Sequence, residues 1–196
     1  MTDGQTFFFV RHGETEPNAR GVRCGGDVDA PLTENGVRQA EALCSTLRGR
    51  GVGVIVASPL QRTRRTAEIV AQALDGIPIV FEPLFAERRL GEWNGRTIAE
   101  TEPLIRARET PPGGESEAEF RDRVARALEA LRPHLPRRPL VVSSRGVARM
   151  LNLLCGGSTG APAANAELIE YRAPGPDPAR RTRSRVPARK REGEAL

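Results

Sequence analysis

Few residues in this chain can serve as acid–base groups or metal ligands. Only two of its 196 residues are histidines, and the three cysteines are scattered with no Cys-x-x-Cys pair. An odd number of dispersed cysteines fits reduced thiols better than a disulfide framework or a zinc site. We therefore expect no metal, no cofactor and a cytoplasmic location.

Long apolar runs and an N-terminal targeting pattern are also missing. No stretch approaches the 18 or so apolar residues of a membrane span, and no basic segment precedes the short apolar stretch near the N-terminus. There is no reason in the sequence to expect a signal peptide or a membrane partner.

Lysine is nearly absent, because every basic residue except Lys190 is arginine. Residues 174–196 hold seven basic and three acidic residues, so this tail carries four of the five net positive charges. Its composition predicts a disordered, solvated extension and is by itself a weak reason to expect a nucleic-acid partner. Residues 1–173 suit one domain, and 38% of the chain is hydrophobic, which is enough for a core.

Short apolar runs alternate with helix-periodic segments in residues 1–173, which is typical of an α/β domain. Strands are predicted at Phe7–Arg11, Val52–Ala57, Ile77–Phe81, Leu140–Ser143 and Glu167–Tyr171. Helices are predicted after Thr33, from Ser58-Pro59, over Glu115–Arg132, and from near Gly146 to Gly156-Gly157. We expect a single α/β domain with a mostly parallel central sheet flanked by helices. The mixed segment Ala86–Gly114 could form a small lid.

The sequence Arg11-His12-Gly13-Glu14-Thr15 stands where the first predicted strand ends. Catalytic groups of parallel sheets gather at the carboxyl ends of strands, beside helix N-termini. Here an arginine would attract an anion, the glycine would let backbone amides approach it, and the imidazole would act as nucleophile. The second histidine, His134, precedes the strand Leu140–Ser143, so we expect it roughly 15–20 Å away, at ~3.3 Å per strand residue.

This motif, followed by Asn18, resembles the signature of the histidine phosphatase superfamily, which includes the cofactor-dependent phosphoglycerate mutases. The next matches are most similar to alpha-ribazole-phosphatase-like members. In chain order the matching residues are Cys24-Gly25, Asp29, Pro31-Leu32-Thr33, Gly36, Gln39-Ala40, Ser58–Thr63, Thr66-Ala67, Glu87, Gly91, Trp93, Gly95 and Gly113–Ser116. The resemblance covers roughly residues 6–171 and implies the phosphoglycerate mutase-like three-layer fold.

The resemblance implies that His12 attacks phosphorus and forms a phosphohistidine. Arg11 and Arg62 would each hold phosphoryl oxygens with a planar fork of donors, and Asn18 and Gly13 would contribute further donors. Two nearby guanidinium groups also disfavour the imidazolium, which keeps the attacking nitrogen unprotonated near neutral pH.

A proton carrier and a pocket wall are implied as well. Glu87, if it is buried enough to stay protonated, would protonate the leaving oxygen and then activate water. Cys24 and Gly25 would line the substrate pocket.

The pattern departs from the family at its second histidine, which usually follows a later strand. Ser144 stands at that position here, and Arg145 follows it. In the family this imidazole helps to stabilise the transferring phosphoryl group, and loss of one such donor commonly costs about 10²–10³ in rate. The Ser144 hydroxyl still offers a donor, while Arg145 could bring a cation into the gap or point to solvent.

The sequence therefore predicts a phosphomonoesterase, a monomer or homodimer, that acts on a small phosphorylated metabolite with weakened or retuned activity. Mutase activity fits less well, because a mutase must protect its phosphohistidine from water. One alternative is a degenerate module that binds a phosphate-bearing ligand without turnover. Another is an enzyme that uses His12 and Glu87 for acid–base chemistry other than phosphoryl transfer.

Overall fold

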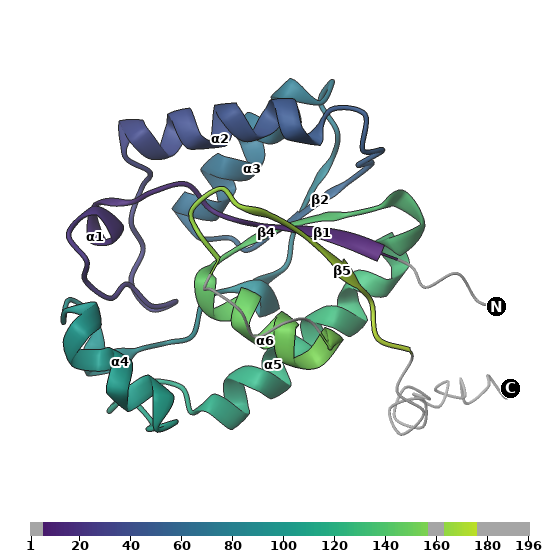
Figure 1. Ribbon diagram of the computed structural model, residues 1–196. Helices are drawn as coiled ribbons and strands as arrows, with labels where there is room; N and C mark the ends of the chain where they lie inside the picture. Colours follow the sequence, from purple (N-terminus) through teal and green to yellow (C-terminus); the bar gives the residue numbers. More distant parts are fainter. Residues whose placement is uncertain (1–5, 157–162, 176–196) are drawn as a thin grey trace, which may run out of the picture.

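The computed structural model describes residues 6–156 and 163–175. Within this part of the chain a five-stranded sheet has the order β3-β2-β4-β1-β5 (Figure 1). The strands are β1 (Thr6–Arg11), β2 (Ile55–Ala57), β3 (Ile79–Phe81), β4 (Leu140–Ser143) and β5 (Leu168–Arg172). Strands β1 to β4 are parallel, whereas β5 pairs antiparallel with β1. The predicted mostly parallel sheet is confirmed.

Helices cover both faces of this sheet, which gives three layers. The helices are α1 (Glu16–Ala19), α2 (Glu34–Leu47), α3 (Gln61–Ala73), α4 (Ile98–Arg106), α5 (Glu117–Leu131) and α6 (Arg145–Cys155), with short 3-10 helices at Pro83–Phe85, Gly91–Trp93 and Arg132–Arg137. Figure 1 shows α2 and α3 on one face and α5 and α6 on the other, with α1 and α4 beyond one end of the strands. None of the described helices is long and apolar enough to cross a membrane.

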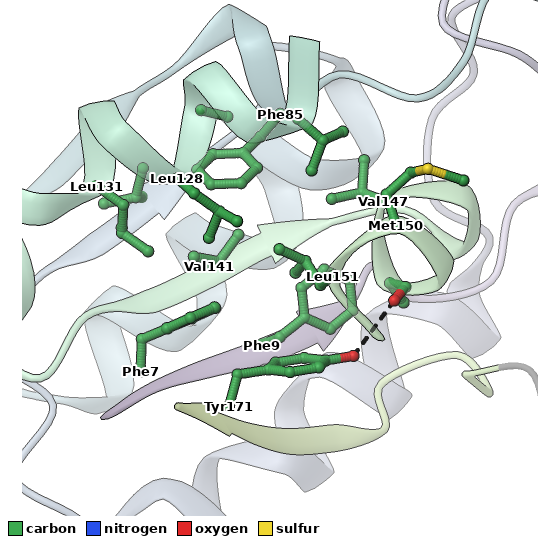
Figure 2. Close-up of a cluster of buried hydrophobic side chains, with 14 of the residues drawn as sticks. Phe7, Phe9, Phe85, Leu128, Leu131, Val141, Val147, Met150, Leu151 and Tyr171 are labelled. Carbon is green, nitrogen blue, oxygen red and sulfur yellow. Dashed lines mark hydrogen bonds between the residues drawn. The ribbon is translucent and has the colours of Figure 1, made fainter. Parts of the chain in front are cut away.

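The central strand β1 is buried on both faces, and its alternating side chains feed two hydrophobic clusters. Phe7 and Phe9 pack in the layer of α5 and α6, whereas Phe8 and Val10 pack in the layer of α2 and α3. The Phe7 and Tyr171 rings stack with their centroids 5.5 Å apart (Figure 2). A continuous apolar run is what a strand covered on both faces requires, so it fixes β1 in the middle of the sandwich.

The predicted start of the second long helix is wrong. The Ser58-Pro59 pattern predicts a cap at Ser58 with Pro59 in the first turn, but α3 begins at Gln61 and Leu60 is still extended. The Ser58 hydroxyl instead hydrogen-bonds Thr63 Oγ1 at 2.7 Å. The carboxylate of Asp29 accepts from the Gln61 N–H at 3.0 and 3.1 Å, so a distant loop supplies the cap.

Other element boundaries move by a few residues. The strands predicted from Val52 and Ile77 begin at Ile55 and Ile79, and α5 begins after Ser116. Thr33 caps α2 as predicted, and Gly156 ends α6 in a left-handed conformation with φ 71°.

The predicted boundary of the tail at 173/174 also shifts. Pro174 and Gly175 accept hydrogen bonds from the Arg132 guanidinium at 2.9 Å each, so the first two residues of that tail contact the domain. Residues 176–196, on which the rest of the tail prediction falls, lie outside the described residues, as does Gly157.

Candidate active site

The ends of β1 and β4 place the two strand-end motifs side by side. In the parallel register Arg11 pairs with Ser143, and the His12 N–H donates to the Ser143 carbonyl at 2.9 Å. His12 and Ser144 are therefore adjacent at the carboxyl edge of the sheet, where α6 begins. His134 lies in the 3-10 helix that leads to the opposite end of β4, as predicted.

His12 is only 4% exposed. Its Nδ1 lies 2.7 Å from the Gly13 carbonyl oxygen. Because a carbonyl only accepts, Nδ1 carries the ring proton and Nε2 keeps its lone pair. Burial, then Arg62, then Arg11 hold the pKa of His12 well below 6.5. The predicted effect of the two guanidinium groups is confirmed.

Arg62 lies in the first turn of α3 and is 1% exposed. Its guanidinium donates to the carbonyls of Gly25 at 3.0 Å and Val28 at 3.1 Å. It also lies 3.7 Å from the Cys24 sulfur and 3.7 Å from Asp29 Oδ1. The loop from Cys24 to Asp29 thus wraps around this cation. Burial raises the pKa of the half-buried Cys24 thiol, which keeps it a neutral neighbour of the guanidinium.

Arg11 and Arg145 bring two more cations to the same edge. Burial, then Arg145, lower the pKa of Arg11 to about 10, with Glu87 acting in the opposite direction. Arg11 Nη1 donates to the Ala163 carbonyl at 3.0 Å, while its buried Nε has no partner among the described residues. Arg145 Nη2 lies 4.0 Å from Glu102 Oε2 of α4. Arg145 therefore lies against both Arg11 and α4.

Glu87 reaches the N-terminus of α6. Its Oε2 accepts from the Gly146 N–H at 2.9 Å, and its Oε1 accepts from the Arg88 N–H at 2.7 Å. A Cβ at residue 146 would collide with Glu87 Oε1, so any larger residue there would displace the Glu87 carboxyl group. The side chain is only partly buried.

Ser144 is buried without a partner. It is 1% exposed, it does not cap α6, and its Oγ makes no hydrogen bond within the described part of the chain. Burying a hydroxyl without a partner costs about 1–3 kcal/mol, so this group is available to a ligand at little further cost.

The Gly13 N–H donates to Thr66 Oγ1 at 3.2 Å, so the expected phosphate contact of this amide would compete with that bond. A Cβ at Gly13 would collide with the carbonyl oxygen of Gly36 at the start of α2. Backbone packing is therefore sufficient to require glycine here.

Asn18 is oriented by local structure and by a residue that the sequence analysis did not single out. Its Oδ1 accepts from the Thr15 N–H at 3.3 Å, as part of the N-terminal cap of α1. Asn165, in the segment before β5, donates to the same oxygen at 3.3 Å and to the His12 carbonyl at 2.8 Å. No sequence signal points to Asn165, because it belongs to none of the motifs.

The segment Ala86–Gly114 is anchored to the loop that follows His12. Asp27 accepts hydrogen bonds from the main chain of Leu90 and Gly91 and from Asn94 Nδ2; burial opposes them, but together they lower the pKa of Asp27. Arg23 donates to two residues of α4, Thr101 at 2.7 Å and Glu102 at 2.8 Å. In Figure 1, α4 lies at the same end of the sheet as α1, as a lid would.

No group of three or more His, Cys, Asp or Glu side chains in residues 6–156 and 163–175 could hold a metal ion. The polar groups at the carboxyl edge include a buried neutral imidazole, the guanidinium groups of Arg11, Arg62 and Arg145, the Asn18 amide and the Ser144 hydroxyl. This set suits an anion with tetrahedral oxygens.

The model of the histidine phosphatase superfamily (branch 1) matches residues 7–171. The chain belongs to this superfamily. The protein of Shigella boydii serotype 18 named probable phosphoglycerate mutase GpmB is 39% identical over 177 residues, which covers 84% of this chain and 80% of that relative. The resemblance read from the motifs is confirmed.

Solved structures give the same result. The mycobacterial glucosyl-3-phosphoglycerate phosphatase Rv2419c, in complex with VO3, superposes with a TM-score of 0.72 at 26% identity and covers 85% of this chain and 90% of its own. The protein TTHB049 from Thermus thermophilus has a TM-score of 0.68 at 30% identity, with coverages of 84% and 92%. The relatives that carry an activity in their names are phosphatases or mutases.

Proposed function

We propose that this protein hydrolyses the phosphomonoester of a small metabolite through a phosphohistidine at His12. The observation that carries the proposal is the unprotonated Nε2 of a buried imidazole whose pKa is held down by burial and by Arg62 and Arg11. The same guanidinium groups that keep this nitrogen nucleophilic attract the phosphoryl dianion.

In the first step His12 Nε2 attacks phosphorus, a P–N bond forms, and the ester P–O bond breaks. The leaving oxygen takes a proton from Glu87 or from water. In the second step a water molecule attacks phosphorus, the P–N bond breaks, and Glu87 accepts the proton of that water. Glu87 accepts two main-chain N–H bonds here, which suits the base of the second step.

Ser144 and Arg145 take the place of the missing second imidazole. The unpartnered Ser144 hydroxyl can donate to a phosphoryl oxygen, and Arg145 adds a charge beside Arg11. Because neither group reproduces an imidazole, we propose a weakened or retuned activity.

The size of the substrate is suggested by the lid. Arg23 is 11% exposed and holds α4 through Glu102, so α4 limits the space near Arg145. A small phosphorylated metabolite fits this arrangement. Glucosyl-3-phosphoglycerate, named for one structural neighbour, illustrates the class. Hydrolysis is preferred over mutase activity, because nothing in the chemistry above protects the phosphohistidine from water.

The test is an aryl-phosphate assay on wild type and His12→Ala, with His134→Ala as a matched histidine control. We expect turnover in wild type and His134→Ala, background activity in His12→Ala, and an acid-labile phosphoenzyme trapped only when His12 is present. Phosphate binding without turnover would instead support the binding module. Conversion of an unphosphorylated metabolite that depends on His12, with no phosphoenzyme, would support acid–base chemistry.

A further inference from the structure

A short segment before β5 holds the end of β1 at three points. Arg11 Nη1 donates to the Ala163 carbonyl at 3.0 Å, and the Ala166 N–H donates to the Arg11 carbonyl at 2.9 Å. Between these contacts, Asn165 Nδ2 donates to the His12 carbonyl at 2.8 Å. The segment therefore fixes the positions of His12, which carries the nucleophile, and of Arg11, which carries the neighbouring cation.

Main-chain groups determine which way both asparagine amides point. The Thr15 N–H only donates, so the atom of Asn18 that lies 3.3 Å from it is the oxygen. The His12 carbonyl only accepts, so the atom of Asn165 that lies 2.8 Å from it is the nitrogen. The contact between the two amides then runs from Asn165 Nδ2 to Asn18 Oδ1, at 3.3 Å.

This arrangement directs the donor of Asn18. With its oxygen held by Thr15 and Asn165, the amide cannot rotate without breaking both bonds. Asn18 Nδ2 is turned away from these partners and donates to none of the described residues. The Nδ2 group of Asn18 is therefore available to donate to an anion at the His12 end of β1.

We propose that Asn165 is a positioning residue for phosphoryl binding, which acts by locking the amide of Asn18 with its N–H donors toward the phosphoryl oxygens. This inference rests on the proposed function, because Asn18 is there a ligand of the phosphoryl group. It assigns a role to a residue outside every motif that identified the family.

A double-mutant cycle separates positioning from general packing. A hydrogen bond to a charged group is worth about 1.5–3 kcal/mol, so Asn18→Ala should lower kcat/KM on an aryl phosphate by about 10–100-fold. Asn165→Ala should lower it several-fold, and the double variant should lose no more than Asn18→Ala alone. The inhibition constant for inorganic phosphate should rise in the same order.

The matched control is Asn152→Ala. Asn152 accepts from the Tyr171 hydroxyl of β5 at 2.6 Å, so its loss also loosens β5 but from the α6 side. We expect this variant to keep the wild-type kcat/KM and phosphate inhibition even if its melting temperature falls. Asn165→Asp, which replaces the donor by an oxygen facing the His12 carbonyl, should lose at least as much activity as Asn165→Ala.

The outcomes separate the two proposals. If wild type turns over but Asn165→Ala matches it, or the two losses multiply in the double variant, the positioning role is wrong while the phosphatase stands. If wild type does not turn over, the phosphatase fails, and calorimetric titration with inorganic phosphate tests the inference with the same variants. Weaker binding in Asn165→Ala then supports it, whereas equal binding, or none by wild type, overturns it.

Discussion

The ends of β1 and β4 are adjacent and parallel, yet they differ in how completely their polar groups are bonded. At the end of β1, His12 Nδ1, the His12 carbonyl and Arg11 Nη1 all have partners, although the buried Arg11 Nε has none among the described residues. At the end of β4 the Ser144 hydroxyl is buried with none among the described residues. A nucleophile that is held through Nδ1 and its carbonyl, beside an unbonded hydroxyl, is what a site would show if its attacking group were retained and its second phosphoryl donor replaced.

The strongest test of this difference compares the arginine at each strand end. Arg11→Lys should reduce turnover by about 10²–10³, because lysine donates from a single nitrogen and lacks the planar fork with which Arg11 can bond the Ala163 carbonyl and phosphate through different nitrogens. Arg145→Lys keeps a charge at a side chain that is 32% exposed, and should cost less than about tenfold. Steady-state kinetics on both variants check this prediction. Equal losses of turnover would show that the arginines at the two strand ends do not differ in importance.

The glycine after each strand end gives a second matched pair. Gly13→Ala drives a Cβ into the Gly36 backbone, so it should destabilise the fold by about 3 kcal/mol or more. Gly146→Ala meets only the end of the Glu87 side chain, so it should lower kcat about 10–100-fold with a much smaller loss of stability. Denaturant melts and kinetics separate the two effects. Gly175→Ala, where a Cβ meets nothing within 4 Å, is the neutral control.

Changes at Ser144 should act on activity without harming the fold. Ser144→Ala removes a hydroxyl that has no partner, so stability should hold within about 0.5 kcal/mol while turnover falls about threefold to tenfold. Ser144→His should raise turnover by about tenfold or more if the imidazole fits at the N-terminus of α6. A stable Ser144→His variant with unchanged turnover would show that the serine does not limit the reaction.

The smallest effect is a pH dependence of stability that originates at the end of β1. The folded pKa of His12 lies well below 6.5, so below pH 6.5 the unfolded chain binds a proton that the folded chain does not. Stability is therefore full above pH 6.5 and falls as the pH drops, by up to about 1.4 kcal/mol per pH unit. His12→Asn should lose this part of the slope in melts between pH 5 and 7.5, whereas His134→Asn should keep it.

Short sequence patterns are enough to predict the family, the positions of the strands and most residues of the candidate site, because each of these features depends on neighbouring residues in the chain. The apolar run of β1 requires burial on both faces, and the Arg11-His12 motif follows directly from its end. Local sequence leaves the role of Gly13 open, because glycine is favoured equally by anion contacts and by close backbone packing, and the packing against Gly36 becomes known only from the fold.

Local pattern also fails where a distant group replaces a local one. Ser58-Pro59 has the form of a helix start, yet α3, capped by Asp29, begins two residues later than that pattern predicts. The resemblance implies a proton carrier at Glu87, but the partner of its carboxyl group, the Gly146 N–H in the first turn of α6, becomes known only from the fold. Neither partner has a spacing that a sequence pattern could reveal.

Local sequence is enough to predict that a histidine and an arginine end a buried strand and that Ser144 stands where the family usually has its second histidine. The groups that hold these residues become known only from the folded chain: Asn165 bonds the His12 carbonyl across 153 residues of chain, and Glu87 bonds Gly146 across 59. The physical reason is that most such contacts end on main-chain N–H and C=O groups, which every residue type carries and no sequence motif marks.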